Sequence, residues 1–209
     1  MVRLFYCDCI AMPQFIIEAG ILAGGKATRL GGQDKGLIRF HDKALCQHVA
    51  DALSPYSKRV LISANRHLAD YRKISPHVHT DSIPDIGPLG GIASLLSQTK
   101  ADYLLLSPCD TPLLDSCYAE RMLSGLEQHG STLLFVASHK NKLQPLHILV
   151  HQSLSASLSL FIASGERKVA NWIASEAHKI ISFSETETMF TNLNSPNDFL
   201  LSEQKTSDQ

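Results

Sequence analysis

Residues 21–36 read Ile-Leu-Ala-Gly-Gly-Lys-Ala-Thr-Arg-Leu-Gly-Gly-Gln-Asp-Lys-Gly. An apolar run over residues 15–23 leads into this glycine-rich segment, which also carries Lys26, Arg29 and Lys35. Glycines let backbone N–H groups approach a ligand closely because no side chain stands in the way. Such amides, combined with cations at the end of a buried strand, predict a loop that binds the phosphates of a nucleoside triphosphate.

The pattern differs from two common phosphate-binding loops. A Walker A loop needs Gly-Lys followed by Ser or Thr, whereas Gly25-Lys26 is followed by Ala27. The dinucleotide fingerprint Gly-x-Gly-x-x-Gly does not occur in the sequence. The order Leu-Ala-Gly-Gly, Arg, Gly-Gly and Asp-Lys instead resembles the signature loop of nucleotidyltransferases with the nucleotide-diphospho-sugar transferase fold. The alternative is a surface loop without a ligand.

The composition is that of an ordinary globular chain. At 209 residues, with 44% hydrophobic and 19% charged residues, the chain is long enough for one domain with a sizeable core. Its 19 basic and 20 acidic residues give a net charge of -1, which argues against the strongly basic surface of a non-specific nucleic-acid binder. No apolar run approaches the roughly 18 residues of a membrane-spanning helix. We therefore expect neither nucleic acid nor a membrane as a partner.

The cysteines and the chain ends bear on compartment and domain limits. Five cysteines without a Cys-x-x-Cys pair favour reduced thiols in the cytoplasm over a secreted disulfide framework. We expect a single, monomeric domain over residues 15–201. An extension at 1–14, either disordered or ahead of the natural start, would precede it, and a frayed tail at 202–209 would follow. The extension lacks the small-residue cleavage site of a signal peptide.

Apolar periodicity predicts strands that alternate with helices. Strands are expected at residues 15–23, 37–40, 60–62, 103–106, 133–137, 146–150 and 180–183, with a weak one at Val78 and turns at 41–43 and 138–142. Helices are expected around residues 45–53, 88–96, 119–126, 154–162 and 169–173, and after Ser195-Pro196. This order predicts an α/β fold, namely a three-layer α/β/α sandwich around a mostly parallel, twisted, Rossmann-like sheet.

Asp110 is a second candidate site residue. It follows the predicted strand 103–106 and lies between Pro108 and Pro112. Ligands of open α/β sheets bind beyond the carboxyl ends of the strands, so Asp110 and the glycine-rich segment are expected at one edge. A carboxylate there is a natural ligand for Mg²⁺, which takes one or two carboxylates together with water and phosphate oxygens. Alternatively, Asp110 caps the following helix or turn.

These residues predict phosphoryl-type chemistry without a covalent protein nucleophile. Lys35, Arg29 and Asp110 are the candidate catalytic residues, with Lys35 on the β- and γ-phosphates and Mg²⁺ on Asp110. Asp81 contacts the nucleotide or a second metal, or else only caps a loop. Gly90 begins a predicted helix, where free backbone N–H groups face an anion.

Over about residues 16–200 the chain resembles the bacterial molybdenum cofactor guanylyltransferase family. The glycine-rich segment and Cys109-Asp110-Thr111-Pro112 mark the wider nucleotidyltransferase superfamily. Narrower marks are residues 47–53, 64–67, 87–89, 165–169 and 192–196. The resemblance implies transfer of GMP from GTP to molybdopterin, which yields the molybdopterin guanine dinucleotide cofactor and pyrophosphate, with Mg²⁺ as cofactor.

The resemblance also implies two sets of binding residues. GTP would be bound by Leu22, Ala23, Gly24, Lys35, Asp81 and Asp110, of which Asp110 also holds the metal, and guanine selection would involve the segment with Ser63 and Asn65. The residue pattern itself adds Gly25 and Gly90 as candidates for GTP binding. Molybdopterin would be bound by Arg167, Lys168, Asn192 and Asn194. The family often has Asn at the position of Ser63, where a backbone contact could replace the amide. Without the resemblance, Arg167 could equally be an exposed charge at a helix end.

Three alternative functions remain open at this point. A cytidylyltransferase or a sugar-phosphate nucleotidyltransferase would share the glycine-rich segment. A non-catalytic carrier of nucleotide or molybdopterin would bind GTP without releasing pyrophosphate. The resemblance further implies transient contacts with other molybdenum cofactor biosynthesis proteins and with recipient apoenzymes.

Overall fold

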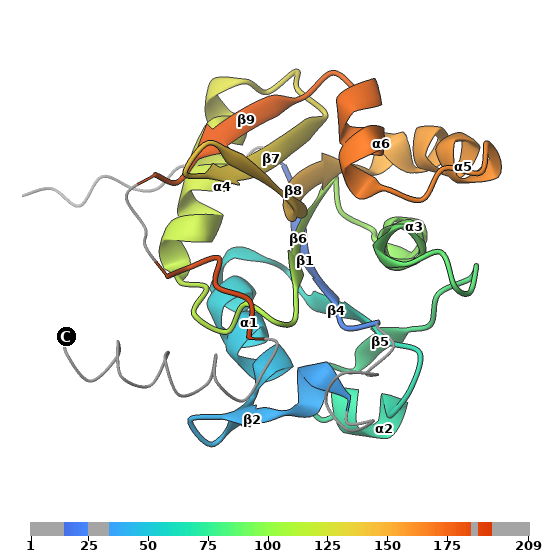
Figure 1. The fold of residues 1–209 in the computed structure, drawn as a ribbon. Helices are drawn as coiled ribbons and strands as arrows, with labels where there is room; N and C mark the ends of the chain where they lie inside the picture. Colours follow the sequence, from blue (N-terminus) through green and yellow to red (C-terminus); the bar gives the residue numbers. More distant parts are fainter. Residues whose placement is uncertain (1–14, 25–33, 185–187, 194–209) are drawn as a thin grey trace, which may run out of the picture.

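A seven-stranded sheet organises the computed structural model, which describes residues 15–24, 34–184 and 188–193 (Figure 1). The strands run in the order β5-β4-β1-β6-β8-β7-β9. Their bounds are β1 Ile17–Leu22, β4 Val60–Ser63, β5 His77–His79, β6 Tyr103–Pro108, β7 Leu134–His139, β8 Lys142–His151 and β9 Lys179–Ser182. Only β8 runs antiparallel to its neighbours, β6 and β7. The predicted mostly parallel sheet is confirmed.

Helices cover both faces of the sheet, as Figure 1 shows. One face packs against α1 (Leu45–Leu53) and α4 (Ser116–Gln128), and the other against α3 (Pro88–Gln98), α5 (Ser155–Ala163) and α6 (Val169–Ser175). Each face has its own cluster of buried apolar side chains. The predicted three-layer α/β/α sandwich is therefore confirmed.

The interior strand β1 is buried along its whole length because helices cover it on both sides. Gly20 in its middle permits close packing of α3, since a Cβ there would lie 2.6 Å from Leu106 Cδ2 and 3.0 Å from Leu95 Cδ1. The continuous apolar run that predicted this strand therefore reflects burial on two faces.

Short elements complete the described chain. A two-stranded hairpin of β2 (Arg39–Phe40) and β3 (Lys43–Ala44) turns at His41 and Asp42, both with positive φ, as expected for a two-residue hairpin turn. The remaining elements are α2 (Leu68–Tyr71) and the 3-10 turns η1 (Lys35–Leu37), η2 (Ser54–Tyr56) and η3 (Gln152–Leu154). Within the described ranges, no helix combines the length and apolar character needed to cross a bilayer.

The hairpin between β7 and β8 corrects one prediction. We predicted a turn over residues 138–142 and a strand only from residue 146, but β8 begins at Lys142 after a two-residue turn at Lys140 and Asn141. The first residues of β8 are mostly polar and extend past the apolar core. Their sequence therefore lacks the apolar pattern of a strand and predicts a loop. A register shift pairs Val136 with Ile148 and Ala137 with Gln144, which leaves residues 145–147 as a bulge.

Several expectations lie outside the described residues. They concern the extension at 1–14, the tail at 202–209, the last helix after Ser195, and the site residues Gly25, Arg29 and Asn194.

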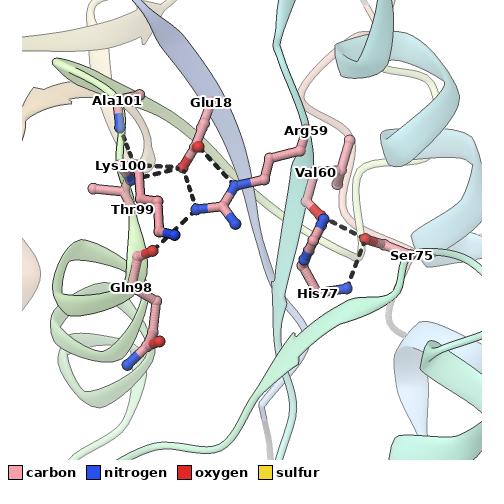
Figure 2. Close-up of polar contacts among 9 residues, drawn as sticks. All are labelled: Glu18, Arg59, Val60, Ser75, His77, Gln98, Thr99, Lys100 and Ala101. Atoms are coloured by element: carbon pink, nitrogen blue, oxygen red, sulfur yellow. Dashed lines mark hydrogen bonds and ion pairs between the residues drawn. The ribbon is translucent and has the colours of Figure 1, made fainter.

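An ion pair fixes the amino-terminal end of the sheet (Figure 2). Glu18 in β1 is only 3% exposed, and Arg59 Nε donates to its Oε1 at 2.6 Å. Oε2 of Glu18 accepts from Thr99 Oγ1 at 2.7 Å and from the Lys100 amide at 3.2 Å. Burial alone raises the pKa of Glu18, but the hydrogen bonds from Arg59, Thr99 and Lys100 outweigh it and lower the pKa below 4.5. Glu18 is thus a satisfied, charged anchor between β1, β4 and α3.

Replacing Arg59 by Ala should lower the free energy of unfolding by about 2 kcal/mol at pH 7, because Glu18 stays buried without its cation. The control K58A removes an exposed cation one residue earlier and should cost less than about 0.5 kcal/mol. Urea titration measures both values.

The same comparison has a defined pH dependence. Because the folded pKa of Glu18 is depressed, its stabilising contribution is present above 4.5 and is lost as pH falls through the lower folded value. The difference in unfolding free energy between R59A and wild type should therefore narrow as the pH falls below 4.5. A gap that stays constant with pH, or an equal loss in K58A, would refute this role of Glu18.

Candidate active site

The carboxyl ends of four parallel strands bring the predicted site residues together. Leu22 at the end of β1 is in register with Ser63 of β4 and Pro108 of β6, and Ser63 is in register with His79 of β5. The residues two positions farther along each segment therefore gather at one edge of the sheet: Gly24, Asn65, Asp81 and Asp110. This edge is opposite to the one that holds Glu18.

Lys35 joins the glycine-rich segment to Asp110. Its Nζ lies 2.5 Å from Asp110 Oδ2, although the two residues are 75 positions apart in the sequence. The side chains are 24% and 19% exposed, so the pair is partly screened from water but open to a ligand. Lys35 is the first residue of η1 and follows Asp34, which is itself buried.

The second carboxylate oxygen of Asp110 is unusual in its lack of a hydrogen-bond partner within the described residues. Oδ1 is buried and has no hydrogen-bond partner among the residues that the structure describes. A buried carboxylate oxygen without a partner is costly, so such an atom points to a ligand that completes it. No described group of three or more His, Cys, Asp and Glu side chains could hold a metal by itself. One carboxylate beside the predicted phosphate-binding segment fits a hard divalent cation that takes its other ligands from phosphates and water.

Asp81 is held by Ser63, the last residue of β4, and by Asn65, two residues farther along the chain. Ser63 Oγ donates to Asp81 Oδ1 at 2.6 Å, and Asn65 Nδ2 donates to Oδ2 at 2.8 Å. The Asp81 amide donates in return to Asn65 Oδ1 at 2.9 Å. Ser63 is fully buried, so its hydroxyl donates to Asp81 from the interior of the protein. Asn65 is exposed at the surface of the site.

A cleft of about 590 Å³ opens beside these residues, within the size range of small-molecule sites. It is lined by Ala23, Gly24, Asp34, Asn65, Arg66, Asp81, Pro84, Asp85 and Gly87. Gly24 lies so close that a Cβ there would be 3.3 Å from Asn65 Nδ2. The first turn of α3 packs closely against Ser63, since a Cβ at Gly91 would lie 2.9 Å from Ser63 Oγ.

The hydrogen bonding of the Gly90 amide differs from our prediction. We predicted a free N–H group that faces an anion, but the Gly90 amide donates to the carbonyl of Gly87 at 3.1 Å. The missing side chain matters instead, because a Cβ at Gly90 would lie 3.0 Å from the Ile83 carbonyl and 3.4 Å from Asp81 Oδ2. Gly90 therefore allows α3 to begin directly beside Asp81.

Other predicted residues lie around this core. The Ala23 amide donates to the Ser63 carbonyl at 2.8 Å, and the Leu22 carbonyl accepts from the Cys109 amide at 3.1 Å. The side chain of Leu22 packs with the α3 face of the sheet, so only its backbone borders the site. The Leu193 amide donates to the Asp110 carbonyl at 2.9 Å, which brings the exposed Asn192 beside Asp110.

Arg167 and Lys168 lie in the loop between α5 and α6, and both are exposed. Nη1 of Arg167 donates to the carbonyls of Ile162 at 3.1 Å and Glu166 at 2.7 Å, so the guanidinium closes the end of α5. Within the described ranges, no hydrogen bond or ion pair joins Arg167 or Lys168 to Asp110.

Sequence reasoning missed two residues of the site. Asp34 lines the cleft, and its place next to Lys35 was an available signal. Tyr71, whose hydroxyl donates to the Asp34 carboxylate, gave no such signal, because one aromatic residue in a four-residue helix reads as core.

Comparison with known proteins identifies the family of the chain. Residues 19–180 match the family model of the MobA-like NTP transferase domain. A molybdenum cofactor guanylyltransferase of Shewanella woodyi is 40% identical over 181 residues, which cover 86% of this chain and 92% of the relative. One of Shewanella putrefaciens is 39% identical over 179 residues, which cover 85% and 91%.

Solved structures share the fold. Molybdopterin-guanine dinucleotide biosynthesis protein A of Archaeoglobus fulgidus superposes with a TM-score of 0.74 at 19% identity, covering 92% of this chain and all of that one. A nucleotidyl transferase of Methanothermobacter thermautotroptrophicus has a TM-score of 0.73 at 11% identity, covering 92% and 98%. With the family model spanning most of the chain and curated relatives near 40% identity, this protein belongs to the MobA-like NTP transferase family and is a nucleotidyltransferase.

Proposed function

We propose that this chain transfers GMP from GTP to molybdopterin, releasing pyrophosphate and forming the molybdopterin guanine dinucleotide cofactor. The observation that carries the proposal is the meeting of Lys35 with the half-satisfied carboxylate of Asp110 beside the cleft. Relatives 40% identical over 86% of the chain are named molybdenum cofactor guanylyltransferases, which supports the choice of substrates.

GTP binding is assigned to the edge formed by β1, β4 and β5. Asp81 is rigidly oriented by Ser63 and Asn65, and its carboxylate is an acceptor. The guanine edge presents adjacent N–H donors at N1 and N2, which suit such an acceptor. Ala23 and Gly24 border the cleft through backbone and small side chains, which leaves room for the nucleoside.

The chemical step is assigned to Lys35 and Asp110. The acceptor phosphate of molybdopterin attacks the α-phosphorus of GTP, a new P–O bond forms, and the bond to the bridging oxygen of pyrophosphate breaks. Lys35 neutralises the β- and γ-phosphates, which carry the charge of the leaving group. Asp110 would hold Mg²⁺, and the bound ion would supply further neutralisation of that charge. Arg29 remains a proposed catalytic residue.

The acceptor side is assigned to Asn192 and Asn194, with Arg167 and Lys168 on its phosphate. Asn192 is favoured by its place beside Asp110. We place the reaction in the cytoplasm, where reduced thiols persist, because Cys46, Cys109 and Cys117 are unpaired. Other cofactor biosynthesis proteins and recipient apoenzymes are the proposed transient partners of a single domain over residues 15–201.

Replacing Asp110 by Asn should lower turnover about 100- to 1000-fold, because Asn keeps the shape but loses the charge that holds the cation. The control D115N alters the N-cap of α4, where Asn serves as well as Asp, and should keep full activity. Pyrophosphate release from Mg-GTP and molybdopterin measures both variants, with melting temperature as the check on folding.

The outcomes also separate the alternatives. A carrier would bind GTP without any pyrophosphate release by the wild-type protein. Turnover with CTP in place of GTP would mark a cytidylyltransferase, and turnover with a sugar phosphate in place of molybdopterin would mark a sugar-phosphate nucleotidyltransferase. Full activity in D110N would remove Asp110 from the mechanism.

Replacing Ser63 by Ala should raise KM for GTP about five- to tenfold with little change in kcat, because Asp81 loses one of the two donors that orient it. The control S75A removes a buried hydroxyl near the amino end of the same strand, where Ser75 Oγ donates to the Val60 carbonyl at 2.5 Å (Figure 2). S75A should leave KM unchanged. Equal KM values in the two variants would show that Ser63 does not act through Asp81.

A further inference from the structure

Tyr71 connects the core of the protein to the cleft. Its ring is fully buried among the apolar side chains on the α1 face of the sheet. Its hydroxyl nevertheless donates to the carboxylate of Asp34, which lines the cleft. Asp34 directly precedes Lys35, so this hydrogen bond acts on the backbone that carries the lysine.

Tyr71 also contacts the residue on the other side of Lys35. A Cβ at Gly36 would lie 3.1 Å from Tyr71 Cε1 and closer still to the hydroxyl oxygen. The ring therefore lies directly against the Gly36 backbone, and only glycine leaves room for it. Tyr71 thus contacts both residues that flank Lys35.

The turn that carries Lys35 has little support of its own. It consists of η1, with hydrogen bonds from the Leu37 amide to the Asp34 carbonyl at 3.0 Å and from the Ile38 amide to the Lys35 carbonyl at 3.2 Å. Asp34 is its N-cap residue, but the side chain makes no capping hydrogen bond and is held by Tyr71 instead. So short a 3-10 turn is marginal without outside contacts.

We propose that Tyr71 is a positioning residue for Lys35: its hydroxyl and ring fix Asp34 and Gly36, and thereby aim the Lys35 ammonium at the nucleotide phosphates. The inference rests on the proposed function, because it takes Lys35 to bind the phosphates of GTP. Burial raises the pKa of Tyr71 far above its usual range, so the hydroxyl stays protonated and keeps donating to Asp34.

The test compares Y71F with a matched control, Y103F. Tyr103 is equally buried, and its hydroxyl donates to the Thr132 carbonyl at 2.8 Å, away from the cleft. Each variant loses one buried hydroxyl and one hydrogen bond. Y71F should lower kcat/KM for GTP about 10- to 100-fold, because a small displacement of a phosphate-binding group is costly. Y103F should lose only thermal stability and keep wild-type kcat/KM.

A double-mutant cycle with Lys35 separates positioning from general loosening. Binding of Mg-GTP is measured by calorimetry, so the readout does not need turnover. Y71F should raise Kd about tenfold in the wild-type background and less than about twofold in the K35M background, where no ammonium is left to position. Equal effects of Y71F in the two backgrounds would overturn the proposal.

The experiment also distinguishes failure of the inference from failure of the function. If the wild-type protein neither binds Mg-GTP nor releases pyrophosphate with molybdopterin, the proposed function fails and the inference with it. If the wild-type protein is active and Y71F matches Y103F in kcat/KM, only the role of Tyr71 is rejected.

Discussion

The ion pair between Lys35 and Asp110 is the contact on which the site depends. It joins the end of the glycine-rich segment to the loop that follows β6, with Lys35 Nζ 2.5 Å from Asp110 Oδ2. A partly exposed pair of this kind adds little to stability by itself. Its value is positional, because it holds a carboxylate with an unpartnered oxygen against a cation whose preceding residue, Asp34, lines the cleft. Under the proposed function, both charges would be in place before the triphosphate and its metal bind.

The carboxylates at the two ends of the sheet differ in how many of their hydrogen bonds are made. Glu18 at the amino end accepts hydrogen bonds from Arg59, Thr99 and Lys100, so it has no capacity left for a ligand. Asp110 at the carboxyl end has one cationic partner and one buried oxygen without any in the described chain. Buried polar groups whose hydrogen bonds are all made stabilise the fold, whereas a buried polar atom without a partner can accept a ligand. The contrast is consistent with a stabilising role for the Glu18 edge and with the catalytic role that the proposed function gives to the Asp110 edge.

Much of the fold and part of the candidate site could be predicted from the sequence. Apolar runs located the strands because the sheet is buried on both faces, and the strand-end rule brought Lys35 and Asp110 to one edge. The start of β8 was missed because it extends past the core. The proposed role of Tyr71 was missed because it depends on contacts of α2 with Asp34 and η1, which no local pattern encodes. The Gly90 amide was misjudged because its partner, the Gly87 carbonyl, depends on the local turn.

The most direct test of the central claim is a crystal structure of the protein with Mn²⁺ and GTP, in which anomalous scattering locates the metal. The account predicts Mn²⁺ on Asp110 Oδ1, with Lys35 Nζ in contact with the β- or γ-phosphate. A metal and triphosphate bound away from both Lys35 and Asp110 would contradict it.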